Sequence, residues 1–385
     1  MTEVEEKKST HKVEVVRVNL EDIPGSDFVG LARVHGYTCV TNKEQWRGTD
    51  LLAAYLPPDS LVDVARPEFS FLARDAKADG KARIKAKRLR GVLSFGLLVP
   101  APEGSAVGDD VSELLGVEHY DPAVRTQNAN RGGLFMGGEA ATAPDVYCVK
   151  YDLEAGRRYA KQLFEPGEPV VISEKIHGAN ARYVFHDGRM HCGSRTEWKK
   201  EYPDYGHVTV ESLAATGKVD EARAKEIVER LRDSPKTKNL WWQALDRTPA
   251  LREFCERNPG TVVYGEVYGA VQDLNYGRQK GEVSFAAFDL MRDGRFLDYP
   301  ESQELAHESL PWVPVLSAGY PGHEFYAEPF DFDRVCELAE GKTLVPGADH
   351  VREGVVVRPV RERRDDRLGR VVLKWVSAGY LERAK

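Results

Sequence analysis

Hydrophobic and polar residues alternate in several short runs over the first hundred residues. The runs cover residues 13–20, 28–34, 51–56, 82–89 and 92–99, and turn residues such as Pro24-Gly25 and Pro57-Pro58 separate some of them. Because successive side chains of a strand point to opposite faces, this alternation predicts short β-strands. We expect these strands to close into a small β-barrel, in which the last two runs pair around Gly91.

The pattern changes after residue 104. Residues 105–147 lack periodicity and are rich in Gly, Pro, Ala and Asn, which predicts a linker with some local order. Helical periodicity follows at residues 153–164 and between 211 and 257, broken near Pro235 and Pro249. Strands are predicted to end at Lys175 and to cover 262–264, 283–290, 354–357 and 371–373. The predicted domains are therefore residues 10–104 and a mixed α/β domain at 148–385.

Composition and charge fit this two-domain interpretation. The chain has 385 residues, of which 42% are hydrophobic and 30% charged, as in a soluble globular protein. No apolar stretch approaches the ~18 residues needed to span a bilayer, and the charged N-terminus lacks the apolar core of a secretory signal. We expect a cytoplasmic protein that does not use a membrane.

The cysteines show no pattern that would join them. Cys39, Cys148, Cys192, Cys255 and Cys336 are widely separated, and none forms a C-x-x-C pair. This spacing favours buried or inert thiols over a disulfide framework or a zinc site.

Basic residues gather on one predicted strand. The net charge of −7 argues against indiscriminate binding of polyanions. Between residues 81 and 90, however, basic residues alternate with small or apolar ones, so one face of the strand would be cationic. Its candidate contacts to a nucleic-acid backbone are Lys81, Arg83, Lys85 and Lys87. An ordinary solvated strand face is the alternative.

One lysine has the setting of a nucleophile. Lys175 lies in the sequence SEKIHGAN at residues 173–180, between an apolar strand and Gly178. An ordinary lysine amine, with a pKa of ~10.4, is mostly protonated at neutral pH, so we expect burial and nearby cations to lower the pKa of Lys175. A second lysine-glycine segment, KADG at residues 77–80, is flanked by charged residues, which predicts a solvated turn with positive φ at Gly80.

Five further segments follow in order along the second half of the chain. They are CGSR at 192–195, YGEVYG at 264–269, FAAFDL at 285–290, REGVVV at 352–357 and VLKW at 372–375. Together with SEKIHGAN they resemble motifs I, Ia, III, IIIa, IV and V of the covalent nucleotidyltransferase superfamily of ligases and capping enzymes. The resemblance implies an α+β chain that ends in a mixed antiparallel-sheet nucleotidyltransferase domain, similar to an ATP-grasp-like ligase.

Two features narrow the resemblance. The histidine form EKIHG, followed by Asn180, is similar to the second phage-type RNA ligase. Only 11 residues follow Lys374, so we expect the C-terminal OB domain of DNA ligases and capping enzymes to be absent. The arrangement resembles the fifth RNA ligase family, in which an N-terminal OB module precedes the nucleotidyltransferase domain.

The resemblance implies a role for each motif residue. Lys175 would be the catalytic nucleophile, and Lys374 a second catalytic lysine that also binds the nucleotide. The other implied ligands are Glu174, Asn180, Arg195, Glu266 and Phe288 for the nucleotide, and Glu353 and Glu266 for a divalent metal. Phe288 would stack on the base, with a core position as an equal alternative. His177 would be either a ligand of metal-bound water or a structural hydrogen-bonding residue.

The implied reaction is ATP-dependent RNA ligation. ATP adenylylates the lysine, AMP passes to a 5′-phosphate end, and a 3′-hydroxyl displaces AMP. The expected cofactors are ATP and a divalent metal, with Mn²⁺ favoured and Mg²⁺ possible, and the expected substrate is RNA or an RNA-containing duplex with a nick. We expect a monomer. A GTP:RNA guanylyltransferase of the capping type and a catalytically inactive OB scaffold that binds nucleic acid are the alternatives.

Overall fold

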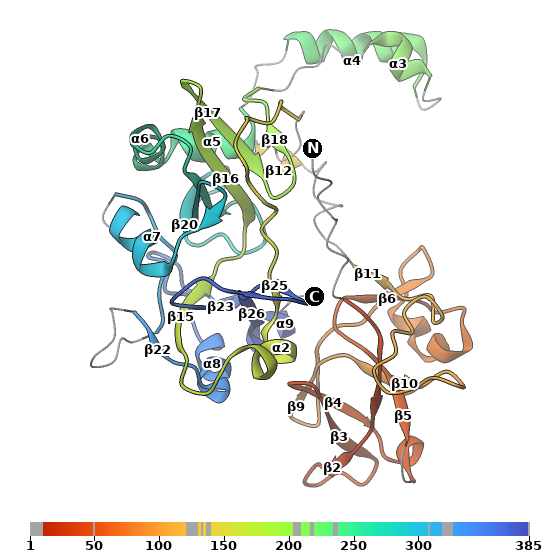
Figure 1. Ribbon diagram of the computed structural model, residues 1–385. Coiled ribbons are helices and arrows are strands. Elements are labelled where there is room, and N and C mark those ends of the chain that lie inside the picture. Colours follow the sequence, from red (N-terminus) through yellow and green to blue (C-terminus); the bar gives the residue numbers. More distant parts are fainter. Residues whose placement is uncertain are drawn as a thin grey trace.

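The computed structural model describes ten segments of the chain. These are residues 11–48, 51–120, 130–131, 134–135, 140–202, 209–215, 219–233, 238–306, 309–317 and 326–383. The N-terminal segments form one lobe, drawn in red and orange, and the rest of the chain forms a larger lobe beside it (Figure 1).

The N-terminal lobe is built from short antiparallel strands. They are β1 (Glu14–Arg17), β2 (Leu20–Asp22), β3 (Val29–Val34), β4 (Tyr37–Asn42), β5 (Leu52–Leu56), β6 (Ser60–Asp63), β7 (Lys81–Arg83), β8 (Lys87–Leu89), β9 (Val92–Ser94), β10 (Leu97–Pro100) and β11 (Glu118–His119). The strands pair in the orders β1-β5-β10, β2-β3-β4, β11-β6-β7 and β8-β9. Two 3₁₀ helices, η1 (Glu44–Trp46) and η2 (Pro67–Asp75), complete the lobe. The predicted set of short strands is confirmed.

The predicted strands at 13–20, 82–89 and 92–99 are each divided in two. Residues 82–89 separate into β7, which pairs with β6, and β8, which pairs with β9 through the expected turn at Gly91. Residues 92–99 bend at Gly96, where φ is +94° and a Cβ atom would lie 2.3 Å from the carbonyl oxygen of Leu56. The prediction of a single strand is wrong here, because the chain pairs with β8 before the bend, as β9, and with β5 after it, as β10.

Part of the predicted linker packs on this lobe. Val111 and Leu115 are buried in its core with Phe69, and β11 adds a strand beside β6. Residues 121–129, 132–133 and 136–139 of the predicted linker lie outside the described residues.

The second lobe contains two sheets. The six-stranded sheet has the order β18 (Trp198–Lys199), β17 (Arg189–Ser194), β16 (Ala179–His186), β19 (Val262–Gly269), β20 (Val283–Arg292) and β21 (Arg295–Phe296). The five-stranded sheet has the order β14 (Glu154–Ala155), β26 (Leu373–Val376), β23 (Gly354–Pro359), β15 (Pro169–Lys175) and β22 (Glu328–Pro329). All pairs are antiparallel except β14 with β26. The short pairs are β12 (Asn130–Arg131) with β13 (Leu134–Phe135) and β24 (Arg364–Asp365) with β25 (Gly369–Arg370).

The helices of this part of the chain are α2 (Gly156–Leu163), α3 (Val210–Ala214), α4 (Glu221–Asp233), α5 (Leu240–Asp246), α6 (Pro249–Arg257), α7 (Tyr299–Ala306), α8 (Phe332–Ala339) and α9 (Ala378–Arg383). In Figure 1, α3 and α4 stand apart from the sheets. The helical prediction for residues 211–257 is confirmed, and Pro249 begins α6 as a first-turn proline should. Pro235 lies outside the described residues. The α+β prediction is confirmed.

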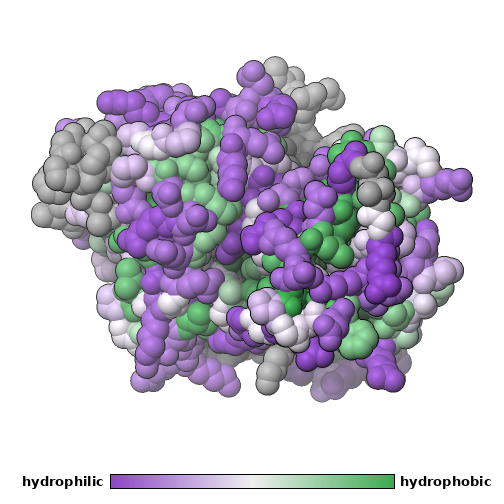
Figure 2. Space-filling view, turned by 90° about the horizontal axis from the view of Figure 1, so that it is seen from below, coloured by the Kyte–Doolittle hydropathy of each residue, from purple (hydrophilic) through white to green (hydrophobic). Residues whose placement is uncertain are grey.

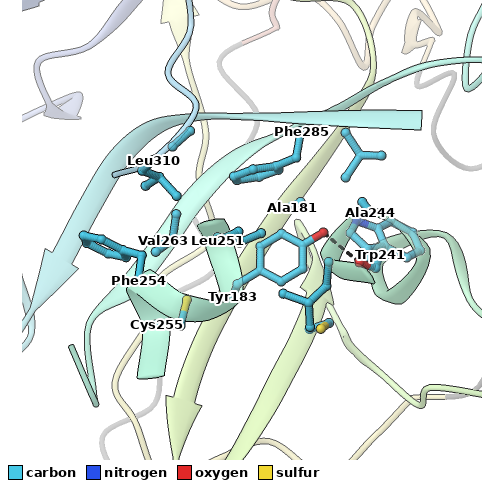
Figure 3. Packing of buried hydrophobic residues seen from close by; sticks show 14 of the residues in the cluster. Ala181, Tyr183, Trp241, Ala244, Leu251, Phe254, Cys255, Val263, Phe285 and Leu310 are labelled. Atoms are coloured by element: carbon cyan, nitrogen blue, oxygen red, sulfur yellow. Dashed lines mark hydrogen bonds between the residues drawn. The ribbon is translucent and has the colours of Figure 1, made fainter. Parts of the chain in front are cut away.

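Each sheet has its own core. Figure 3 shows Tyr183 of β16 packed among Leu251, Phe254 and Phe285, with its hydroxyl donating to the carbonyl oxygen of Trp241 over 2.9 Å. Helices α2 and α8 bury the five-stranded sheet through a separate cluster that includes Trp375. Helices α2 and α8 pack on one face of the five-stranded sheet. The opposite face of this sheet carries Lys175 and is free to meet functional groups of the six-stranded sheet.

The thiols agree with the sequence prediction. All five cysteines are free, and three of them are buried. Within the described segments, no helix has both the length and the apolar composition required to cross a bilayer. Figure 2 shows one face of the molecule, on which hydrophilic residues separate small hydrophobic areas.

Candidate active site

Three motif residues gather at one end of the five-stranded sheet. Lys175 is the last residue of β15 and lies opposite Gly354, the first residue of β23, so Glu353 stands directly beside it. Lys374 lies on β26, opposite Val356 of β23. Two lysines and one carboxylate from distant parts of the sequence therefore meet on three neighbouring strands.

Lys175 and Glu353 form a partly buried ion pair. The Nζ atom of Lys175 donates to Oε1 of Glu353 over 2.7 Å, and their side chains are 22% and 10% exposed. Burial disfavours the ammonium, but the carboxylates of Glu353 and Glu266 outweigh it and raise the pKa of Lys175. The expected lowering of this pKa is therefore wrong for the unliganded site. The charges beside Lys175 that act on its pKa are these two carboxylates rather than cations.

The pair also determines the charge of Glu353. Burial opposes ionisation, but Lys175 and His177 lower the pKa of Glu353 to about 2. Glu353 is thus a carboxylate at neutral pH. Its second oxygen, Oε2, faces Nδ1 of His177 at 3.6 Å.

The six-stranded sheet contributes a second carboxylate. Glu266 on β19 lies opposite Asn180 on β16. Burial raises the pKa of Glu266 to about 8, with Lys175 opposing the shift and Glu353 adding to it. The Oδ1 atom of Asn180 is buried and has no hydrogen-bond partner among the described residues. A buried acceptor of this kind is costly unless a ligand satisfies it.

Glycines beside these carboxylates bring strands together. A Cβ atom at Gly354 would lie 1.9 Å from the carbonyl oxygen of Trp375, and one at Gly265 would lie 2.3 Å from the ring of Phe285. These glycines allow close approach of the protein to itself, which holds Glu353 and Glu266 in place.

Lys374 differs electrostatically from Lys175. Burial and the charge of Lys175 lower the pKa of Lys374, while Glu353, Glu154 and Asp59 oppose them. Asp59 belongs to the N-terminal lobe, where it lies between β5 and β6. The N-terminal lobe therefore lies near enough to act on the charge of the site.

Arg195 and Phe288 lie at the edge of the cluster. Arg195 follows β17, and its Nη1 atom is 3.4 Å from Oδ1 of Asp152. It also acts on Glu266, whose pKa it lowers against the effect of burial. Phe288 is half-buried on β20 with its ring centroid 4.7 Å from that of Tyr151. A partly exposed ring with one packed side fits both alternatives, base stacking and core.

Glu174 is not brought together with the other motif residues. Adjacent side chains of a strand point to opposite faces, so Glu174 lies on the face of β15 away from Lys175. Its buried carboxylate accepts hydrogen bonds from the backbone nitrogen of Leu344, over 2.7 Å, and from the hydroxyl of Thr343. Its role in nucleotide binding stays a prediction.

The sequence analysis missed two residues that contact the ring of His177 and a third that binds one of them. Asp273 lies with Oδ1 2.9 Å from Nε2 of His177, Tyr380 places its hydroxyl 3.3 Å from both ring nitrogens, and Arg383 binds Asp273. Each stands outside the six motifs. The sequence signal that could have found them is weak, since it consists only of their polarity next to buried segments.

The basic strand is partly neutralised. Lys81 pairs with Glu118 over 2.6 Å, and Arg83 pairs with Asp59 over 2.5 Å. Lys85 and Lys87 are exposed, and Lys87 has only a loose contact of 3.8 Å with Asp75. The KADG segment forms the expected turn, with a φ of +73° at Gly80.

The donor set fits one class of metal. No group of three or more His, Cys, Asp or Glu side chains forms a metal cage within the segments that the structure describes. The two carboxylates of Glu353 and Glu266 are nevertheless close enough for the charge of Glu353 to raise the pKa of Glu266, beside the larger effect of burial. Mg²⁺ and Mn²⁺ are commonly held by one or two carboxylates together with substrate phosphates and water. The residues present therefore fit such a metal.

Comparisons with known proteins give a consistent result. The family described as RNA ligase matches residues 168–376, and an OB-fold domain matches residues 12–101. Three similar solved structures are mutants of an RNA ligase from Naegleria gruberi. Two were solved with ATP and Mn, at 21% and 22% identity and TM-scores of 0.71 and 0.70. Each covers 97% of this chain and 99% of that chain.

The third was solved with AMP and Mn, at 21% identity and a TM-score of 0.70, and covers 97% of this chain and 98% of that chain. No curated protein sequence matches the chain. The likeness extends over both lobes, so the predicted order of an OB barrel followed by the second domain is confirmed.

Proposed function

The chain belongs to the RNA ligase family, and from this premise we propose that it joins RNA ends with ATP through an AMP group bound to Lys175. The observation that carries the proposal is the partly buried cluster of Lys175, Glu353 and Lys374 at the ends of three adjacent strands. Similar proteins solved with ATP, AMP and Mn support ATP and Mn²⁺ as cofactors, with Mg²⁺ possible.

The first step uses the amine of Lys175. It loses its extra proton and attacks the α-phosphorus of ATP, forming a nitrogen–phosphorus bond while the bond to pyrophosphate breaks. Lys374 stabilises the charge that develops on the phosphate oxygens. Glu353 and Glu266 would hold the divalent metal, which supplies charge neutralisation at the phosphates. Asn180 and Arg195 bind phosphate oxygens, and Phe288 stacks on the base.

Two later steps use RNA. A 5′-phosphate oxygen attacks the AMP phosphorus and releases Lys175, and a 3′-hydroxyl then attacks the 5′-phosphate of the capped RNA and releases AMP. We propose a nick in an RNA-containing duplex as the substrate, a monomeric enzyme, and Lys85 and Lys87 as phosphate contacts on the barrel. The influence of Asp59 and Arg83 on the pKa values of Lys374 and Tyr380, which are otherwise dominated by burial, supports a barrel that faces the site.

A labelling experiment tests this function. The protein is incubated with α-labelled ATP or GTP and Mn²⁺ and then denatured. We expect label from ATP alone, and none in Lys175→Met. The matched control is Lys77→Met, which removes the lysine of the solvated KADG turn and should label normally. Label from GTP alone would favour a capping enzyme, and no label from either nucleotide would favour an inactive scaffold.

A sealing assay tests the substrate. Nicked duplexes with ribose or deoxyribose varied separately on the 3′-hydroxyl and 5′-phosphate sides are offered to the wild-type protein. We expect sealing to require 3′-hydroxyl and 5′-phosphate ends and ribose on the 3′-hydroxyl side. Equal sealing of all-DNA nicks would contradict the assignment to RNA.

A further inference from the structure

The turn after Lys175 joins the two sheets of the second lobe. Residues 176–178 connect the end of β15, in the five-stranded sheet, to the start of β16 at Ala179, in the six-stranded sheet. Lys175 precedes the turn, and Asn180 follows it on β16, opposite Glu266. The shape of this turn therefore sets the position of the nucleophile relative to the functional groups of the other sheet.

The loop between β19 and β20 holds the turn through two hydrogen bonds. The hydroxyl of Tyr276 accepts from the backbone nitrogen of His177 over 2.7 Å. The Nε2 atom of Gln272 donates to the carbonyl oxygen of Gly178 over 3.3 Å. A Cβ atom at Gly178 would lie 2.2 Å from the carbonyl oxygen of Val267, so the turn also packs directly on β19. These three contacts fix the turn to the six-stranded sheet.

Tyr276 has a strained backbone conformation. Its φ is +51°, in the left-handed region, where a bulky side chain costs free energy. Its ring is fully buried and meets the rings of Tyr268 and His350 edge-on at centroid distances of 5.3 and 4.5 Å. A glycine at this position would avoid the strain, but the backbone nitrogen of His177 would then lose its acceptor. The strained conformation thus places the hydroxyl of Tyr276 at the turn.

The loop that carries Tyr276 also packs against the segment before β23 of the five-stranded sheet. A Cβ atom at Gly277 would lie 2.0 Å from the carbonyl oxygen of Gly347. His350 of the same segment contacts the ring of Tyr276, and Ile176 of the turn is buried in the same apolar cluster as this ring. Tyr276 is therefore held in a fixed position relative to both sheets.

We propose that Tyr276 is a positioning residue that fixes the turn through its hydrogen bond to the backbone of His177, and that this contact aligns the amine of Lys175 with the α-phosphorus. The inference rests on the proposed ligase function and assigns a role to a residue outside the six motifs. The first two steps form and break the bond between Lys175 and phosphorus, whereas the third step does not involve this bond. Loss of the hydroxyl should therefore slow the first two steps more than the third, which a general loss of stability would not do.

The test removes the hydroxyl and keeps the buried ring. In Tyr276→Phe, the maximal single-turnover rate of label formation should fall about tenfold, while the ATP concentration that gives half of this rate stays within about twofold of the wild type. Sealing of a nick that already carries AMP on its 5′-phosphate should stay within about threefold of the wild-type rate. Tyr299→Phe is the matched control and should change none of these values, because Tyr299 is also buried and its hydroxyl has no hydrogen-bond partner among the described residues.

A readout without activity is the hydrogen exchange of the His177 amide, measured by NMR. Its exchange rate should rise about tenfold or more in Tyr276→Phe and stay unchanged in Tyr299→Phe. An unchanged exchange rate in Tyr276→Phe would overturn the proposal even if the wild-type protein formed no label, an outcome that by itself overturns only the ligase function. In an active enzyme, three kinetic results would also overturn the proposal, namely normal labelling, equal losses in labelling and sealing, and a weakened ATP affinity at a normal maximal rate.

Discussion

The Nζ atom of Lys175 and Oε1 of Glu353 lie 2.7 Å apart in a partly buried ion pair. The expected nucleophile and the expected metal ligand thus neutralise each other in the unliganded protein. This arrangement avoids an isolated buried charge, which would cost several kcal/mol. It also requires a second source of positive charge for the phosphates, because Lys175 is consumed in the first step. Lys374 is in position to be this source.

Replacing Lys374 should therefore slow the first step. We expect Lys374→Met to reduce the rate of label formation by about 10²–10³-fold, the usual effect of removing one group that stabilises transition-state charge. Apparent ATP affinity should change much less. Measuring the rate of labelling across ATP concentrations separates the two effects. A variant with normal maximal rate and weakened ATP binding would show that Lys374 serves only in binding.

Gly354 should not tolerate a side chain. Its φ is +156°, and a Cβ atom would lie 1.9 Å from the carbonyl oxygen of Trp375, which cannot move without breaking the β23–β26 pair. We expect Gly354→Ala to lower the free energy of unfolding by about 1–3 kcal/mol or more, as overpacking generally does. It should also reduce labelling, since Glu353 precedes it. Urea unfolding measures the first effect, with Gly188→Ala, in open space at the surface, as a control for the cost of alanine at a positive φ.

The sequence predicted the order of the motifs but only part of their geometry. Local patterns identified the strands that carry Lys175 and Glu266 and the strand that follows Glu353, because alternation and glycines act over a few residues. The ion pair joins residues 178 positions apart, and the contact of Tyr380 with His177 spans 203 positions. Such contacts depend on how strands pair, which no local pattern determines. For the same reason the sequence did not show that residues 82–89 divide between two sheets.

A buried acid should make stability depend on pH. Asp289 is fully buried and binds Arg358 at 3.0 Å and Arg370 at 2.6 Å. Burial opposes ionisation, but the two guanidinium groups lower the pKa of Asp289 below its ordinary value. A lowered folded-state pKa stabilises the protein above the unfolded pKa of ~3.9, and this stability is lost as pH falls toward the folded value.

Asp289→Asn should lower the free energy of unfolding at pH 7 by about 3 kcal/mol, because the buried guanidinium groups of Arg358 and Arg370 then lose a negatively charged partner. Glu362 also binds both arginines, which limits the loss. The variant should lose less stability than the wild type between pH 5 and pH 3. Urea unfolding at several pH values measures this, with exposed Asp293→Asn as the control. Parallel pH profiles of wild type and variant would contradict the assignment.

The salt dependence of RNA binding should distinguish two pairs of basic residues on the barrel. Lys81 and Arg83 are already paired with Glu118 and Asp59, whereas Lys85 and Lys87 are exposed. A cation that contacts a phosphate releases counterions and contributes about 0.7–0.9 to the slope of log affinity against log salt. A cation that keeps its carboxylate partner contributes less, because the pair has little net charge.

We therefore expect Lys85→Ala with Lys87→Ala to reduce this slope by roughly one to two, and Lys81→Ala with Arg83→Ala to reduce it by clearly less than one. Fluorescence anisotropy with a nicked RNA-containing duplex between about 50 and 200 mM salt measures both. Labelling with ATP, which needs no RNA, should stay normal in the first variant and thereby verify its folding. If the two double variants lowered the slope equally, ion pairing on β7 would not limit its contacts with RNA. If neither lowered it, the basic strand would be an ordinary solvated face, and the RNA path would lie elsewhere.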